Sequence, residues 1–151
     1  MADKLFSDYL KKTLSRYFQI SVLDNPELLM DTAISQNPDA IIIDDNVNGI
    51  SGDILSTQIK EDKTIGYIPI ILLLRAFDNE SYLSHLGSGA DRLGLRTESI
   101  CKLRADILIG WLEIYLYRVN TGLLRFMVKK KLLHSLSPCK VVTCCPLTEG
   151  L

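Results

Sequence analysis

The sequence predicts an α/β domain in which helices cover both faces of an open parallel sheet, giving three layers. Two apolar runs, Ala40–Ile43 and Ile68–Leu74, are continuous rather than alternating, which is typical of parallel strands buried on both faces. Segments with helical periodicity alternate with these runs, as expected for right-handed β-α-β crossovers. The chain has 151 residues, 47% of them apolar and 23% charged, so its length and composition suit one globular domain.

Residue spacing predicts the first elements of the chain. Apolar residues recur at helical spacing over Lys4–Tyr17, and a β-favouring run follows at Gln19–Leu23. A second helix is expected to begin near Pro26, which suits a first helical turn, and to end before Asn37. Its expected inward face consists of four apolar residues: Leu28, Leu29, Ala33 and Ile34.

The later elements alternate in the same way. We expect a strand over Asp39–Asp44, a loop over Asn46–Gly52, a helix over Asp53–Asp62, a strand over Ile68–Leu74, a helix over Asp78–Leu86, a strand over Arg92–Leu95 and a helix from Ser99 past Trp111. Gly49 and Gly52 are expected as turn glycines, because the lysine of a phosphate-binding P-loop is absent beside them.

The distribution of charge and cysteine limits the class of protein. Residues 1–103 carry 10 Lys/Arg and 15 Asp/Glu, and residues 104–151 carry 7 and 3, so an acidic body precedes a basic tail. A nucleic-acid partner is not expected from this pattern. The four cysteines lack zinc or redox-motif spacing, so we expect reduced thiols in a cytoplasmic protein. No signal peptide is expected, because charges from Asp3 to Lys12 interrupt every apolar stretch at the start. No membrane span is expected either, because the longest apolar stretch, Ile107–Tyr117, is about half of the roughly 20 residues that a span requires.

Charged residues stand where three predicted strands end. Asp44 and Asp45 follow the first buried strand, Arg75 the second and Arg96 the short third one. Sites in open α/β sheets form beyond the carboxyl ends of the strands. Asp44 would there hold a magnesium ion or accept a phosphoryl group as a carboxylate nucleophile. The alternative is that Asp44 caps its strand, Asp45 is solvated and Arg75 makes a surface salt bridge.

Four stretches, taken in order, have the features of one known family. Pro38–Gly52 resembles the phosphoacceptor strand and loop of the receiver domains of two-component response regulators, and Ile59–Leu73 resembles their third helix and fourth strand. Leu86–Asp91 is similar to their Gly-Ala-Asp turn, and Leu103–Ile107 to the opening of their last helix. The resemblance runs from about residue 5 to residue 109. It implies a flavodoxin-like sandwich with the sheet order 2-1-3-4-5.

The resemblance also implies a signalling module in a phosphorelay rather than an enzyme. Asp44 would be the phosphoacceptor, and the backbone carbonyl of Asn46 would join Asp44 in holding Mg²⁺. Arg96 would stand in place of the lysine of the family, whose charge it keeps without the compact geometry. The expected partner is a histidine kinase or another phosphodonor protein, with a homodimer or a sister receiver as a further partner.

Several departures from the family pattern weaken this chemistry. Leu74 replaces the Thr or Ser that hydrogen-bonds the phosphoryl group, Asn48 replaces the loop proline, and Thr97 replaces the proline after the lysine. The acid pair that holds magnesium at the end of the family's first strand would fall at or before Met1. We therefore expect weak Mg²⁺ binding and weak phosphorylation of Asp44. The alternative is a non-phosphorylated pseudo-receiver that serves as a protein–protein interaction module.

The first strand of the family also has no counterpart ahead of the first helix. In the family's order it would lie between Gln19–Leu23 and Ala40–Asp44, and its loss would leave two unpaired strand edges. Three interpretations are open. The chain is a fragment, a partner or second copy completes the sheet, or the tail contributes its β-favouring run Lys140–Cys145. We favour the first of these from the sequence.

The end of the chain does not share the resemblance. We divide the chain into a truncated receiver-like domain over residues 1–109 and a helical basic tail over residues 110–151. A membrane-surface or nucleic-acid contact is one interpretation of the tail, and we favour a helix with a solvated basic face. His85 and His134 have no nucleophile at a catalytic spacing, so no enzymatic activity is expected.

Overall fold

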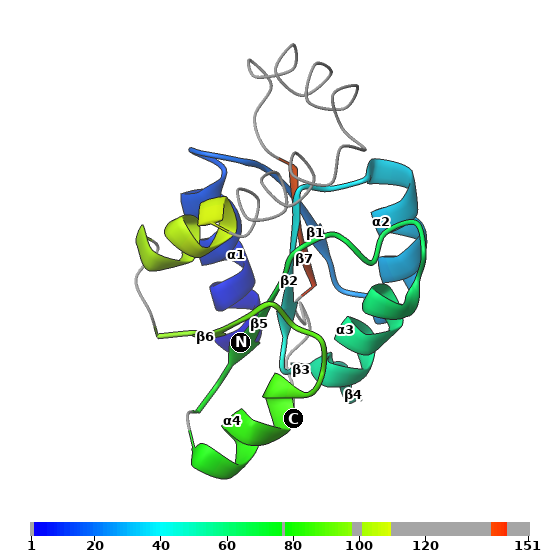
Figure 1. Cartoon of the computed structure of the whole chain (residues 1–151). Coiled ribbons are helices and arrows are strands. Elements are labelled where there is room, and N and C mark those ends of the chain that lie inside the picture. Colours follow the sequence, from blue (N-terminus) through cyan, green and yellow to red (C-terminus); the bar gives the residue numbers. More distant parts are fainter. Residues whose placement is uncertain (1, 77, 98–100, 110–139, 145–151) are drawn as a thin grey trace.

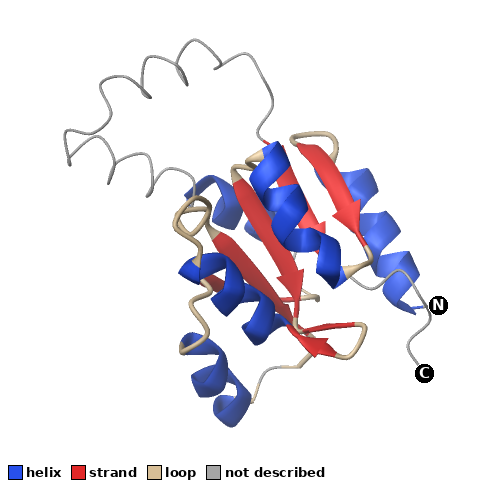
Figure 2. Ribbon diagram, turned by 90° about the vertical axis from the view of Figure 1, so that its right-hand side faces the viewer, coloured by secondary structure: helices blue, strands red, loops and turns tan. Residues whose placement is uncertain are grey.

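The computed structural model describes residues 2–76, 78–97, 101–109 and 140–144 (Figure 1). Five strands form one sheet in the order β1-β7-β2-β5-β6, and every neighbouring pair is parallel. The strands are β1 (Gln19–Leu23), β7 (Lys140–Cys144), β2 (Ala40–Asp44), β5 (Ile70–Leu74) and β6 (Arg92–Leu95). The predicted α/β class with a parallel sheet is confirmed. Figure 2 shows the strands running side by side between helices on both faces.

The expectation that the sheet lacks its central strand is wrong. β7 comes from the end of the chain and lies between β1 and β2, the place that the first strand has in the order 2-1-3-4-5 (Figure 1). Val142 is in register with Ser21 on one side and with Ile41 on the other. The structure therefore bears out the contribution from the tail, and the gap that favoured a fragment does not exist.

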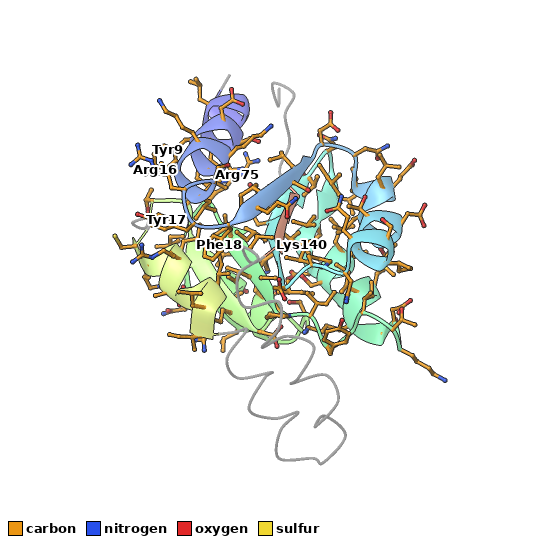
Figure 3. The ribbon with its side chains drawn as sticks, turned by 90° about the horizontal axis from the view of Figure 1, so that it is seen from above. Tyr9, Arg16, Tyr17, Phe18, Arg75 and Lys140 are labelled. Carbon is orange, nitrogen blue, oxygen red and sulfur yellow. The ribbon has the colours of Figure 1, made fainter. Side chains whose placement is uncertain are left out.

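β7 suits this central place because its side chains alternate between two apolar layers. Val141 and Val142 are each 1% exposed and pack into the clusters on opposite faces of the sheet. Where β7 begins, the Asp39 N–H donates to the Lys140 carbonyl at 2.7 Å, and the Asp39 Oδ2 accepts from the Lys140 N–H at 2.9 Å. Viewed from above, Lys140 lies near the middle of the fold (Figure 3).

Two layers of helices cover the sheet. α1 (Ala2–Leu14) and the helix over residues 101–109 lie on one face, and α2 (Leu29–Gln36) and α3 (Gly52–Glu61) lie on the other (Figure 1). The first face packs on an apolar cluster that includes Leu10, Leu14, Ile42, Leu73, Leu103 and Ile107. The second face packs on a cluster that includes Leu29, Ala33, Ile43, Leu55, Ile59 and Leu72. The three predicted layers are thus present.

The second predicted helix is divided in two. A 3₁₀ turn over Pro26–Leu28 precedes α2, and the Asn25 side chain caps that turn by accepting from the Glu27 N–H at 3.0 Å. Of the expected inward face, Leu29 and Ala33 are buried, whereas Leu28 and Ile34 are 49% and 52% exposed. The tighter 3₁₀ geometry turns residue 28 away from the stripe that α2 presents to the sheet.

Other boundaries differ from the prediction by a few residues. The expected loop after β2 contains a small hairpin, with β3 (Asn46–Val47) antiparallel to β4 (Ile50–Ser51), and α4 spans Asn79–Leu86. Residues 140–144, grouped with the helical tail above, are a strand. The predicted continuation of the last helix past Trp111 and the rest of the tail, including His134, lie outside the described residues. Within the described ranges, no helix is long and apolar enough to cross a membrane.

Candidate functional site

Asp44 is the last residue of β2, and its side chain is fully buried. Its Oδ1 accepts a hydrogen bond from the Asn46 N–H at 3.3 Å. Asp44 lies in the β2–β5 ladder, and the residue after it is fixed as well, because the Asp45 N–H donates to the Leu73 carbonyl at 2.9 Å and the Gly52 N–H donates to the Asp45 carbonyl at 2.8 Å. The sheet therefore holds this carboxylate rigidly at its carboxyl edge.

Arg96 supplies the closest positive charge to Asp44. It follows β6 directly, and its N–H continues the ladder by donating to the Leu74 carbonyl at 3.0 Å. Its side chain is 14% exposed and donates from a terminal nitrogen to the Asp44 Oδ2. The guanidinium carbon lies 4.6 Å from the centroid of the Phe6 ring on α1. The guanidinium of Arg96 thus contacts both a carboxylate and an aromatic ring.

Arg75 forms a second and more exposed ion pair at the same edge. Its Nε lies 3.3 Å from the Asp45 Oδ1 and 3.8 Å from the Asp44 Oδ1, and its N–H donates to the Asp45 Oδ2 at 3.2 Å. The side chain of Arg75 is 47% exposed and that of Asp45 is 22% exposed. The structure matches the expected salt bridge of Arg75, whereas Asp45 is engaged by Arg75 rather than solvated. Two acids and two arginines leave this cluster with no formal net charge.

The pKa of Asp44 reflects its burial more than its ion pair. The pKa of Asp44 is raised from its usual value of 3.8 to about 6, chiefly by burial and next by a hydrogen bond with the Asp45 side chain. The hydrogen bond and the charge of Arg96 oppose the rise, as does the hydrogen bond from Asn46. A carboxylate removed from water is costly to ionise, and Arg96 only partly offsets that cost.

The residues at this edge do not fit a magnesium ion. Mg²⁺ requires oxygen ligands in nearly octahedral geometry, and the family holds it with an acid pair at the end of the central strand. β7 occupies that place, and no residue of Lys140–Cys144 carries a carboxylate. The contact of Asn46 with Asp44 is made by its N–H, and the Asp44 Oδ2 is taken by Arg96. Among the described residues, no three His, Cys, Asp or Glu residues are grouped so as to hold a metal.

The hairpin after Asp44 explains why Asn48 and Gly49 stand at its turn. Asn48 and Gly49 both have left-handed backbones, with φ of 51° and 85°, as a two-residue hairpin turn requires. Proline cannot adopt such a φ, so the family's loop proline is excluded at Asn48.

Gly52 has a different role from the turn predicted for it, because it begins α3. A Cβ at Gly52 would lie 2.2 Å from the Asp44 carbonyl oxygen.

The other positions of the family's phosphorylation machinery are apolar or exposed. Leu74 is buried and 1% exposed at the end of β5, and Thr97 is exposed. No sequence pattern singles out Phe6, which lies 90 positions from Arg96 and belongs to an ordinary amphipathic helix. Only the packing of α1 against the sheet brings the two side chains together.

His85 contributes to the structure through Asp53. Its Nδ1 lies 2.7 Å from both carboxylate oxygens of Asp53, and the two side chains are 15% and 25% exposed. The pair connects α4 with the first turn of α3, whose N-cap is the side chain of Ser51. His85 is thus a partly buried residue that joins two helices.

The structure is similar to solved receiver domains. No protein-family model and no curated protein matches the sequence. A putative response regulator from Chloroflexus aurantiacus J-10-fl matches at a TM-score of 0.68 and 18% identity, over 73% of this chain and 91% of that one. The receiver domain of Francisella response regulator 1452 matches at 0.66 and 21%, over 74% and 91%. The Mn²⁺-bound form of response regulator Rcp1 matches at 0.55 and 15%, over 69% and 82%.

These similarities show that the chain has the receiver fold. The fold places Asp44 at the carboxyl edge of the strand that follows β7 in the sheet, where the sequence resemblance also places the phosphoacceptor. The differences lie in what surrounds Asp44.

Proposed function

We propose that this chain is a receiver-like module of two-component signalling that acts by binding another protein, independently of phosphorylation at Asp44. The observation that carries the proposal is the occupation of the buried Asp44 carboxylate by the Arg96 guanidinium. In this arrangement an arginine supplies the positive charge that a metal ion would otherwise supply. The module would have no enzymatic activity of its own.

The surroundings of Asp44 oppose a phosphoryl group for two further reasons. Transfer to a carboxylate adds negative charge, and receiver chemistry offsets that charge with a metal ion, for which β7 carries no acids and the described residues form no metal-binding group. Leu74 offers no hydroxyl to the phosphoryl oxygens. Phosphorylation changes the shape of a protein only when the phosphoryl group makes better contacts in one conformation than in another. With few contacts available at Asp44, a phosphoryl group could shift the balance between an inactive and an active conformation only slightly.

The expected partners follow from the receiver fold. They are a histidine kinase, another phosphodonor protein or a sister receiver, bound through the helical faces, or a second copy of this chain. A cytoplasmic location and the absence of nucleic-acid binding remain predictions.

Weak phosphorylation of Asp44 is the second candidate function. It is favoured by the position of Asp44 at the end of β2 and next to the hairpin over residues 46–51. For a phosphodonor to react, Arg96 would have to leave the Asp44 Oδ2. A cation would also have to be held by ligands from outside β7, which has no carboxylate.

Intact mass spectrometry distinguishes the two candidates. The full chain is incubated with Mg²⁺ and acetyl phosphate, beside an Asp44→Asn control, and circular dichroism verifies that both are folded. We expect no phosphate-sized gain in mass and no change in melting temperature on addition of Mg²⁺ alone. A gain that the control lacks would establish Asp44 as a phosphoacceptor and overturn the proposal.

A further inference from the structure

The contact between Phe6 and Arg96 has no counterpart in the phosphorylation machinery discussed above. Arg96 is fixed at its backbone by β6 and β5, but its long side chain has several rotatable bonds. Its guanidinium contacts the Asp44 carboxylate and the Phe6 ring, whose centroid is 4.6 Å from the guanidinium carbon. A guanidinium that is this close to a ring face and largely shielded from water is attracted by the ring quadrupole.

Phe6 is itself well anchored. It is partly buried and packs against the same apolar cluster as Leu10 and Leu14, which are 2% and 0% exposed. The position of the ring is therefore determined by how α1 lies on the sheet. Any displacement of the first turns of α1 would move the ring away from the guanidinium.

We propose that Phe6 is a positioning residue that holds Arg96 on Asp44, so that the Asp44 site is coupled to α1. This inference deepens the proposed function, on which it rests, because it names the element through which a bound partner would change the site. The family's coupling uses a hydroxyl at the position of Leu74, which is apolar and buried here. The Phe6–Arg96 contact provides a physical connection on the opposite, α1-bearing face of the sheet.

Three substitutions in the full chain separate positioning from general stability. Phe6→Leu keeps apolar bulk and removes the ring, and Phe6→Tyr keeps the ring. Phe18→Leu removes another phenylalanine from the same cluster, where Phe18 is 5% exposed and its ring contacts that of Tyr17. Circular dichroism verifies folding, and Arg96→Gln marks the complete loss of the guanidinium.

The deciding measurement is the exchange of the Arg96 Nε–H with water, followed by NMR in ¹⁵N-labelled protein. We expect this exchange to be about fivefold faster in Phe6→Leu than in the wild type, and unchanged in Phe6→Tyr and Phe18→Leu. The Asp44 carboxyl resonance, titrated in parallel, should shift in Phe6→Leu toward its behaviour in Arg96→Gln.

Equal exchange in Phe6→Leu and the wild type would overturn the positioning role, and so would equally fast exchange in Phe6→Leu and Phe18→Leu. The result is independent of the mass measurement, which tests the proposed function. Phosphate uptake by the wild type would overturn that function. The positioning role of Phe6 would still stand or fall with the exchange rates of the Arg96 Nε–H.

Discussion

Asp39 and Lys140, 101 positions apart in the sequence, exchange two hydrogen bonds at the start of the central strand. The Asp39 N–H donates to the Lys140 carbonyl at 2.7 Å, and the Lys140 N–H donates to the Asp39 Oδ2 at 2.9 Å. The carboxylate thus satisfies a backbone donor at the point where β7 enters the sheet between β1 and β2. A residue just ahead of β2 thereby fixes the register of a strand from the far end of the chain.

Replacing Asp39 with alanine should weaken the attachment of the start of β7 to the sheet. The Lys140 N–H would lose a charged acceptor, a change worth about 1–2 kcal/mol in the free energy of unfolding. Urea unfolding followed by circular dichroism measures this change, with Asp24→Ala, at an exposed position near the end of β1, as the matched control. Equal stability of the two variants would show that the Asp39 side chain does not hold β7.

Gly52 should not tolerate a side chain. A Cβ there would lie 2.2 Å from the Asp44 carbonyl oxygen and 2.5 Å from the Leu72 Cδ1, so α3 would have to move away from β2. We expect Gly52→Ala to destabilise the fold by about 1–3 kcal/mol. In Gly87→Ala the new Cβ would meet only the Ser84 carbonyl oxygen at 3.7 Å, so its melting temperature should stay close to that of the wild type.

The raised pKa of Asp44 should give stability a recognisable dependence on pH. Because the folded state binds this proton more tightly than the unfolded state does, the stability that Asp44 contributes is fully present below about pH 4 and is lost as the pH rises to about 6. Between about pH 4 and pH 7 the loss from this group is about 2 kcal/mol.

Asp44→Asn removes that titration and leaves the other carboxyl groups in place. The unfolding free energy of the wild type minus that of the variant should therefore fall between about pH 4 and pH 7. A difference that stays constant, or that rises with pH, would mean that Arg96 outweighs burial and that the pKa of Asp44 is not raised.

The contact of His85 with Asp53 should stabilise α4 locally. None of the α4 residues whose burial the structure describes belongs to the two buried clusters, so we expect the attachment of α4 to α3 to depend on this contact. We expect His85→Ala to increase amide exchange in Asn79–Leu86 while lowering global stability by no more than about 1 kcal/mol. Ser84→Ala, at an exposed neighbouring position, is the control, and equal exchange in both variants would contradict the role given to the pair.

The sequence by itself determined the parts of the fold that depend on neighbouring residues. Continuous apolar runs such as Ala40–Ile43 predict buried strands, because a strand covered on both faces has no polar side. Helical periodicity located α1 and α3 within about three residues of their observed ends. The ends of β2, β5 and β6 also placed Asp44, Arg75 and Arg96 at one edge of the sheet, because parallel strands bring their carboxyl ends together.

Only the tertiary structure decided which strand fills the centre of the sheet and which side chains surround the Asp44 carboxylate. The run Lys140–Cys144 has β-favouring residues, but nothing local specifies its neighbours, since parallel pairing depends on two sheet edges and on apolar layers built by residues far away in the sequence. The same holds for Arg96. Its charge is visible in the sequence, whereas its position between Asp44 and Phe6 exists only because α1 packs on the face of the sheet next to the end of β6.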